Sequence, residues 1–486
     1  MLFLGIDHTP RQLQAVVFSL ESNGVVAGAA RPAPDEAVPG FVTDPKAWLR
    51  AIDACVSECL GHLGSERSRL AGMTVSGHGG GMILLGRDHE VLRPVEGPHW
   101  EERGEAARAL RRRFGGTPGV VELLGQSLPS NSAAVDLFRL TRSERELVDE
   151  LALVHGTADF FRGWLTGVSS AELSNAAESG LLDARACKWS EVMVGEIDPR
   201  LPACLPSLSP SRELSAGLRP EVARKWGVPD HLLVAGGGSR VAGQLLGAGA
   251  CTPGEVLVDL SSSGCLHLVM EEPVVDPMGQ LSLRCDTNSQ WFLSLREAAS
   301  GTFAEEVMEQ WKWDRGQLEE EAGKVAPGAG GLVFLGGAEG GTLAGIRNGN
   351  LSASNLARAA SEALALELGR ALERMRELGG KPERARILGM AGAGEGRRQM
   401  LADVFGIPVA VGDTTSSPAL GAALQAAAAF YAASGENLSH AEIVEYALPT
   451  RDSDWTQPSA PRSSIYEELA NRQARLERLM HEETPA

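Results

Sequence analysis

The stretch that decides the fold lies at the start of the chain, where residues 1–18 read MLFLGIDHTPRQLQAVVF. Two apolar runs, Leu2–Ile6 and Leu13–Phe18, have the length and composition of β-strands, and the polar segment Asp7–Pro10 separates them. A third run of this kind, Gly24–Ala30, follows a turn signal. The three runs predict a β-meander.

Helix and strand patterns alternate along the rest of the chain. After the meander we expect a helix at Pro45–Leu63 and a strand at Leu70–Ser76, and this alternation predicts an α/β domain up to about Ala235. The second half repeats the plan with strands at Gly254–Leu260, Cys265–Met270, Arg386–Gly389 and Pro408–Val411 and helices at Ser354–Leu378, Arg397–Phe405, Ser417–Ala433 and Ser464–His481. A strand, a polar loop and a second strand thus occur near Asp7 and again near Asp259. Two related halves sharing a cleft would explain this, although chance similarity remains an alternative.

The charge composition of the chain argues against two classes of binding partner, nucleic acids and anionic membranes. The 486 residues include 45 Lys and Arg against 63 Asp and Glu, which gives a formal net charge of −18. Nonspecific binding to nucleic acid or to an anionic membrane needs a basic face, so we expect neither partner. The length suggests two large domains.

The cysteines indicate a reduced protein. There are seven, with no CxxC pair, and Cys55 and Cys59 share a helix face without the further ligands that zinc needs. The N-terminal segment has no basic region of the kind that precedes a signal peptide, and the Ala-rich run 422–433 is too short to span a bilayer. We therefore expect free thiols and a cytoplasmic location.

Four polar or Gly-rich turns follow predicted strands and could cradle phosphate through backbone N–H groups. They are Asp7–Pro10, Gly236–Ser239, Ser261–Gly264 and Ala391–Gly396. Each turn alone could equally be a plain turn. Their position at the carboxyl ends of strands is where α/β sheets bind ligands.

Several motifs occur in an order that resembles the FGGY carbohydrate kinases, and the nearest resemblance is to the xylulokinase-like branch. The resembling segments are Leu4–Asp7, Val75–His78, Leu92–Pro94 with Trp100–Arg103, Glu172–Ala176 with Ser179–Asp183, Val234–Gly238, Gly247–Gly249 with Pro253–Val256, Gly389–Gln399, Ala402–Val404 with Gly406–Val409, Ala419–Ala423 and Tyr466–Leu479. The resemblance implies an α/β fold of two actin-like ATPase (ribonuclease H-like) domains, with mixed sheets flanked by helices and a cleft between them. We expect the N-terminal domain at 1–244, the C-terminal domain at 245–440 and a tail with a closing helix at 441–486.

The same resemblance implies an enzyme, a carbohydrate kinase that transfers a phosphoryl group from ATP to a ketose of the pentulose type with Mg²⁺. It assigns Asp7 to catalysis and to magnesium through water. Asp259 stands where the family tends to have a small residue, and its carboxylate could substitute as a metal ligand or as a base. Sugar binding falls on His78, Trp100 and Glu172, and nucleotide binding falls on Thr9, Ser261, Ser262, Ser263, Gly264, Ala391, Gly392, Ala393 and Gly394. A sugar and a nucleotide are the implied partners, and a homodimer is left open.

Departures from the family pattern put catalysis in question. The family's Asp-x-Gly-Thr reads Asp7–Pro10 here, and its catalytic aspartate falls on Ser239, whose hydroxyl is a poor base near pH 7. Arg240 follows where an uncharged amide is usual, and it could bind an anion. The alternatives are a catalytically inactive pseudokinase that binds nucleotide or sugar, or an enzyme with another acceptor.

Each site residue also has an ordinary structural interpretation. His78 would be a structural or exposed histidine, Trp100 a packed tryptophan and Glu172 a glutamate on a helix surface. Glu395 and Arg397, beside the adenosine-side turn, are expected to be solvated.

Overall fold

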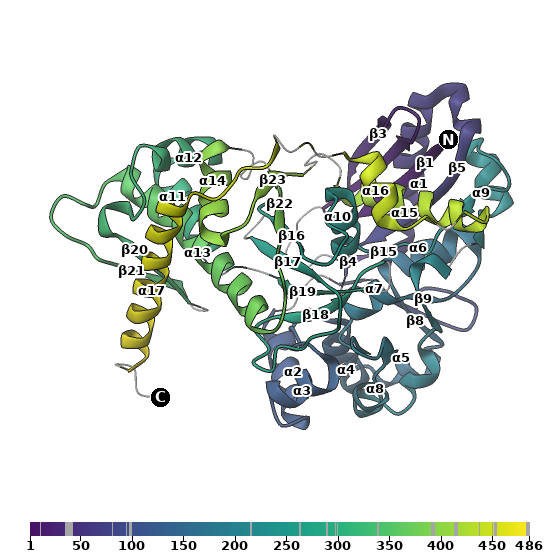
Figure 1. The fold of residues 1–486 in the computed structure, drawn as a ribbon. Coiled ribbons are helices and arrows are strands. Elements are labelled where there is room, and N and C mark those ends of the chain that lie inside the picture. The colour runs from purple at the N-terminus through teal and green to yellow at the C-terminus, as the bar shows by residue number, and fades with distance from the viewer. Residues whose placement is uncertain are drawn as a thin grey trace. The chain divides into compact units, whose positions relative to one another are not determined.

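The computed structural model divides the chain into two compact units, each formed from segments that are not consecutive in the sequence (Figure 1). The first unit comprises Met1–Cys251, Met270–Phe292 and Thr415–Pro449, and the second comprises Thr252–Val269, Leu293–Thr414 and Thr450–Ala486. The described residues are all except 10, 35–41, 80, 94, 97–99, 214–215, 262–263, 288–289, 297, 299, 338–339, 390–393, 413–416, 437, 450, 452–453 and 483–486. The domain boundaries expected at 244 and 440 stay predictions.

A seven-stranded mixed sheet forms the centre of the first unit. Six strands lie in the order β13-β14-β5-β1-β2-β3. The seventh, β15, pairs with the end of β5, after the residues of β5 that pair with β14. The strands are β1 (Leu2–His8), β2 (Gln12–Ser19), β3 (Gly24–Pro32), β5 (Leu70–Gly77), β13 (Ala216–Gly217), β14 (Leu233–Val234) and β15 (Gly238–Ser239). Because β1, β2 and β3 are antiparallel neighbours, the predicted meander is confirmed.

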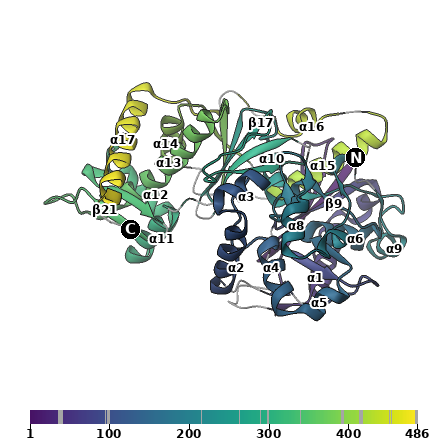
Figure 2. The ribbon, with the colours of Figure 1, turned by 90° about the horizontal axis from the view of Figure 1, so that it is seen from below.

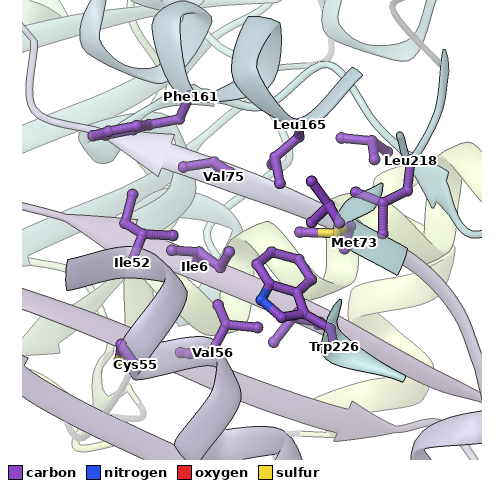
Figure 3. Close-up of a cluster of buried hydrophobic side chains, with 14 of the residues drawn as sticks. Ile6, Ile52, Cys55, Val56, Met73, Val75, Phe161, Leu165, Leu218 and Trp226 are labelled. Atoms are coloured by element: carbon purple, nitrogen blue, oxygen red, sulfur yellow. The ribbon is translucent and has the colours of Figure 1, made fainter. Parts of the chain in front are cut away.

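Helices cover both faces of this sheet because side chains alternate along its strands. Leu4 and Ile6 of β1 join a core with the helices α1, α6 and α9, which Figure 3 shows around Trp226 and Met73. Phe3, which directly precedes Leu4, faces the opposite core with α10, α15 and α16. The helices are α1 (Pro45–Leu63), α6 (Thr157–Thr166), α9 (Pro220–Trp226), α10 (Arg240–Ala248), α15 (Ser417–Ala433) and α16 (His440–Ala447).

The rest of the first unit is a helical lobe with its own apolar core and several very short strand pairs. Its helices are α2 (Trp100–Arg113), α3 (Thr117–Leu124), α4 (Ala133–Ser143), α5 (Arg145–Glu150), α7 (Leu173–Ala177) and α8 (Glu191–Ile197). Its strands are β4 (Val42–Thr43), β6 (Met82–Leu85), β7 (Val95–Glu96), β8 (Leu153–Gly156), β9 (Ala171–Glu172), β10 (Leu182–Asp183), β11 (Lys188–Trp189), β12 (Leu208–Ser209) and β18 (Ser282–Cys285).

In the second unit, β17, β16, β22 and β23 lie in that order, and β16, β22 and β23 run parallel. The elements that lie mostly here are β16 (Glu255–Asp259), β17 (Cys265–Met270), β19 (Trp291–Leu295), β20 (Val333–Gly337), β21 (Gly340–Ala344), β22 (Arg384–Leu388), β23 (Val409–Val411), α11 (Gly301–Trp311), α12 (Arg315–Gly323), α13 (Ala353–Glu377), α14 (Glu395–Phe405) and α17 (Ala460–Glu482). Figures 1 and 2 show α17 beside the β20–β21 hairpin, where the Gln473 side-chain amide donates to the Phe334 carbonyl at 2.9 Å.

Most of the predicted elements are confirmed with small differences at their ends. The helix Pro45–Leu63 and the strand Cys265–Met270 occur with the expected bounds, and the closing helix is longer by a few residues at its start. α1 begins at Pro45 because the Asp44 carboxylate accepts a hydrogen bond from the Lys46 amide at 2.9 Å, which satisfies a free N–H group of the first turn. Among the described residues, no helix is both long and apolar enough to cross a membrane.

Candidate functional site

In the first unit, three parallel strands bring several predicted site residues to one edge of the sheet. β1 and β15 both pair in parallel with β5, and the register sets Asp7 opposite Ser76 and Ser239 opposite Gly77. His78 follows directly at the end of β5. The carboxyl ends of parallel strands are the usual ligand side of an α/β sheet.

Asp7 is buried and already engaged by two side chains. The Ser76 hydroxyl donates to Oδ1 of Asp7 at 2.5 Å, and Nε of Arg240 donates to Oδ2 at 3.3 Å. Burial raises the pKa of Asp7, and the positive charge of Arg240 opposes that rise. The anion that Arg240 binds is therefore a carboxylate of its own chain.

Ser239, which the sequence analysis expects at the family's base position, serves as the N-cap of α10. Its Oγ accepts a hydrogen bond from the Ala242 amide at 3.2 Å, and its own amide donates to the Ser174 hydroxyl at 2.9 Å. The side chain is almost fully buried. Because the Ser239 hydroxyl already accepts the capping hydrogen bond of α10, it does not replace a carboxylate as proton acceptor.

Glu172 lies in the interior at the N-cap of α7, so its interpretation as a surface glutamate is wrong. Its Oε2 accepts hydrogen bonds from the Ser174 hydroxyl at 2.6 Å and the Asn175 amide at 2.9 Å. Within the described part of the chain, Oε1 has no hydrogen-bond partner. Burial raises the pKa of Glu172 to about 8, so the side chain is largely protonated at neutral pH. Through Ser174, Glu172 connects to the backbone of Ser239.

The other first-unit residues differ in how they are used. His78 is exposed, and its amide donates to the His8 carbonyl at 3.0 Å. The Thr9 hydroxyl accepts from the Gln12 amide at 2.8 Å and donates to the Gln12 carbonyl at 3.0 Å, so it closes the β1–β2 turn. Trp100 begins α2, but its side chain lies outside the described part of the structure.

Sequence reasoning did not identify the residues that engage Asp7 and Glu172. Ser76 lies in the family-like segment Val75–His78, but no sequence pattern indicates that its hydroxyl binds Asp7. The structure also places the Glu178 carboxylate against the backbone of the segment after β5, since a Cβ built on Gly79 would lie 2.5 Å from Oε2 of Glu178. Glycine at 79 thus leaves space that this carboxylate fills.

The second unit contains the other two predicted phosphate-binding turns, Ser261–Gly264 and Ala391–Gly396. β16 pairs in parallel with β22, so Asp259 and Leu388 end side by side. A Cβ built on Gly389 would lie 2.7 Å from the Ser261 amide nitrogen, and Gly389 has a φ of 92° that favours glycine. The Asp259 carboxylate accepts from the Ser261 amide at 2.8 Å, which shapes the turn toward Gly264. Ser262, Ser263 and 391–393 lie outside the described residues.

Two residues at the start of α14, next to the loop expected to bind adenosine, show how this part of the chain is supported. Gly394 is the N-cap of α14, where a Cβ would lie 2.5 Å from Oε2 of Glu319. Arg397 is buried, which contradicts its expected solvation, because Glu319 pairs with it at 3.7 Å and the Ser361 carbonyl and hydroxyl accept its hydrogen bonds.

A magnesium ion held by Asp7 does not fit the residues present. The cation would have to displace the Arg240 guanidinium, which already balances the charge of the carboxylate. Among the described residues, no group of three or more His, Cys, Asp and Glu side chains is placed to hold a metal. The assignment of magnesium to Asp7 or Asp259 remains unsupported by this geometry.

Comparisons with known proteins cover nearly the whole chain. The N-terminal domain model of the FGGY family of carbohydrate kinases matches residues 2–247, and the C-terminal domain model matches residues 289–430. The xylulose kinase of Haemophilus influenzae is 23% identical over 401 residues, which are 79% of this chain and 81% of that protein. The xylulose kinase of Streptomyces coelicolor is 27% identical over 440 residues, or 88% of this chain and 87% of that protein.

Solved structures agree on the fold. The crystal structure of a xylulose kinase from Rhodospirillum rubrum has a TM-score of 0.87 and 23% identity, and the match covers 99% of each chain. The predicted fold class, two actin-like ATPase domains with mixed sheets flanked by helices, is confirmed. Since both domain models match in order and together span most of the sequence, the chain belongs to the FGGY family of carbohydrate kinases, a family of phosphotransferases.

Proposed function

We propose that this protein binds ATP and a ketose of the pentulose type and transfers the γ-phosphoryl group slowly to a sugar hydroxyl. The support is the family assignment together with the similarity to xylulose kinases. Enzymatic phosphoryl transfer depends mostly on positioning and on charge stabilisation. A site of this family would therefore keep part of its rate without a dedicated base.

The nucleotide side of the proposal rests on the two loops of the second unit. Positive φ angles at Gly264 and Gly389 let the backbone turn tightly, so that N–H groups can face a phosphate. The assignment of Thr9 rests on the resemblance alone, because its amide donates to the Gln12 carbonyl at 2.9 Å and its hydroxyl is used in the same turn. The residues assigned to nucleotide are Thr9, Ser261, Ser262, Ser263, Gly264, Ala391, Gly392, Ala393 and Gly394.

The carbohydrate side would use the edge where β1, β5 and β15 end. The exposed imidazole of His78 can donate or accept a hydrogen bond to a sugar hydroxyl. Glu172 would act mainly by holding the turn before Ser239, because Oε2 is occupied by Ser174 and Asn175. Trp100 is assigned by resemblance as a surface on which the sugar ring could stack.

The observation that carries the slow rate is the use of Ser239. Its hydroxyl caps α10, and it offers no carboxylate to accept the proton of the attacking hydroxyl. Loss of a general base typically costs about 10²–10⁴-fold in rate. Magnesium held at Asp7 forms no part of this proposal.

Binding without transfer is the second candidate, and the ion pair of Asp7 and Arg240 favours it. The Arg240 guanidinium occupies the Asp7 carboxylate, so this carboxylate is not free to take the proton of an attacking hydroxyl, and the guanidinium itself accepts no proton. A protein of this kind would act as a nucleotide or sugar sensor.

The experiment is isothermal titration with ATP, repeated in the presence of each member of a ketopentose panel, followed by a phosphoryl-transfer assay. Under the proposal, one ketopentose tightens ATP binding and slowly becomes phosphorylated, whereas an aldohexose control does neither. ATP binding without coupling or transfer would favour the sensor. Absence of ATP binding at millimolar concentration would contradict both the kinase and a nucleotide sensor, and would leave only a sugar sensor.

A further inference from the structure

Two thiols of the first unit lie close together although they are distant in sequence. The Sγ atoms of Cys187 and Cys285 are 3.7 Å apart across a sequence separation of 98 residues. A disulfide bond is about 2.0 Å long, so the sulfurs need to approach by roughly 1.7 Å. A movement of this size is within the reach of side-chain adjustment, without a rearrangement of the fold.

A shared carbonyl holds the two thiols in this arrangement. Cys187 lies in the turn between β10 and β11, and Cys285 ends β18. Both Sγ atoms approach the Ala184 carbonyl oxygen, at 3.7 Å for Cys187 and 3.6 Å for Cys285. The indole N–H of Trp291 donates to the same oxygen at 2.8 Å, which fastens the turn next to the end of β18.

The two sulfurs differ in environment as an attacking and a resolving thiol would. Cys187 is partly exposed, whereas Cys285 is buried. The hydrogen bond from Cys285 lowers the pKa of Cys187, and the same contact, together with burial, raises the pKa of Cys285. By contrast, burial raises the pKa of Cys55 to about 11 and that of Cys59 to about 12, so those thiols stay inert.

We propose that Cys187 and Cys285 form an oxidisable dithiol that closes to an intramolecular disulfide when a low-molecular-weight disulfide reaches it. The Cys187 thiolate attacks one sulfur of the oxidant, breaks its S–S bond and releases one thiolate. The Cys285 thiol then loses its proton and attacks the Cys187 sulfur, which expels the second thiolate. The protein loses two protons and two electrons, and the oxidant becomes two thiols.

The dithiol lies next to the turn that carries the base position. Cys285 is followed by Asp286 and Thr287, and a Cβ built on Gly238 would lie 2.6 Å from the Thr287 methyl group. Gly238 precedes Ser239. A bond from Cys285 to the β10–β11 hairpin would therefore restrain the segment that packs on this turn, whatever ligand the site binds. The proposal does not depend on the proposed kinase activity.

The test is incubation of the native full-length protein with oxidised glutathione at pH 8, followed by intact-mass measurement and peptide mapping after alkylation. We expect a loss of two titratable thiols, a mass decrease of two hydrogens and a single cross-linked peptide pair containing Cys187 and Cys285. Dithiothreitol should reverse all three changes. Trp291 fluorescence should change in parallel, since its indole N–H shares the Ala184 carbonyl with both thiols.

Matched variants give the controls. Cys59→Ser, at a buried thiol with a raised pKa, should oxidise as wild type does. Cys285→Ser should stop at a mixed disulfide of glutathione with Cys187, and Cys187→Ser should take up no glutathione. The proposal is overturned if native protein keeps all its thiols, if the cross-link joins other cysteines, or if Cys285→Ser forms no mixed disulfide while remaining folded by circular dichroism.

Discussion

At the scale of single residues, two neighbours explain how the site departs from its family. Ser239 caps α10, as an aspartate could, and under the proposed assignment it leaves the site without the family's proton acceptor. Arg240 adds a charge whose partner, Asp7, lies 233 residues away in sequence. The first change is visible in the sequence, whereas the second could not be predicted, because no local pattern pairs residues at that separation.

Replacing Arg240 by Gln should leave a buried carboxylate without its cation. Removing one partner of a buried charged hydrogen bond costs about 1–3 kcal/mol, so urea unfolding at pH 7 should show a loss in that range. The double variant Asp7→Asn with Arg240→Gln should recover part of the loss, because it leaves no unpaired charge. Strictly additive losses in this double-mutant cycle would contradict the ion pair.

Glu172 gives a pH prediction. Burial raises its pKa from 4.5 to about 8, so the folded state favours the protonated form. This contribution to stability is complete below the ordinary value and disappears as the pH rises through about 8. Relative to Glu172→Gln, wild type should therefore lose up to about 1.4 kcal/mol of unfolding free energy per pH unit between pH 5 and 8.

Urea unfolding at four pH values in this range measures the difference. The exposed Glu221, whose pKa is lowered by its surroundings, provides the control substitution Glu221→Gln, which keeps Glu172 and should therefore lose stability with pH as wild type does. A difference between wild type and Glu172→Gln that stays constant with pH would contradict the assignment.

At the scale of elements, the close packing of α15 on the first sheet explains why the family-like segments Leu4–Asp7 and Ala419–Ala423 carry small residues at their contact. A Cβ on Gly5 of β1 would lie 1.8 Å from the Ala419 carbonyl oxygen and 2.5 Å from the Ala423 nitrogen. On Gly72 of β5, a Cβ would lie 3.2 Å from the Ala426 carbonyl oxygen. The strand and helix backbones thus approach closely, which leaves no room for side chains between them.

Gly5→Ala should prevent folding or destabilise the protein severely, and Gly72→Ala should cost a smaller amount, about 1–3 kcal/mol. Gly61→Ala is the matched control, because nothing lies within 4 Å of its Cβ position in α1. It should gain about 0.5–1 kcal/mol. Thermal unfolding of the three variants ranks their stabilities directly. A Gly72→Ala variant as stable as wild type would contradict the close packing of α15 on β5.

Elements with strong local signals could be predicted, and those defined by distant partners could not. α1 has a capping Asp44, a proline at its first position and buried residues at helical spacing, so both ends agree with the prediction. The pair of β9 and β12 has two residues in each strand, too few for a periodic pattern. Arg397 resembles a solvated helix residue until Glu319 and Ser361, from other helices, are known.

At the scale of the molecule, each unit is assembled from three separate segments. The alternation of helices and strands predicts two α/β halves, but it does not reveal that 270–292 and 415–449 pack with the first unit. Those contacts join residues far apart in the chain, such as Arg284, whose guanidinium donates to the Ala177 carbonyl.

Three buried histidines of the first unit predict acid sensitivity. Burial lowers the pKa of His8 to about 3 and those of His155 and His440 to about 4. Their contribution is present above the ordinary value of 6.5 and is lost as the pH falls, because the unfolded chain then takes up protons. Unfolding free energy should fall by about 1.4 kcal/mol per pH unit per histidine below pH 6.5.

His440→Leu should reduce this acid slope, measured by denaturant unfolding between pH 6.5 and 4.5. The exposed His62 supplies the control His62→Leu, which should leave the slope unchanged. Equal slopes for wild type and His440→Leu would show that this histidine is not held neutral in the folded state.

The proposed function assumes that position 239 is where the family's proton acceptor would lie and that Ser239 does not replace it. The most direct measurement is the steady-state rate of phosphoryl transfer from ATP to a ketopentose for Ser239→Asp and Ser239→Asn. Both residues cap a helix well, but only the carboxylate can accept a proton. We expect a rate for Ser239→Asp at least about 10²-fold above those of Ser239→Asn and wild type. Equal rates for the two variants, at equal stability, would contradict it.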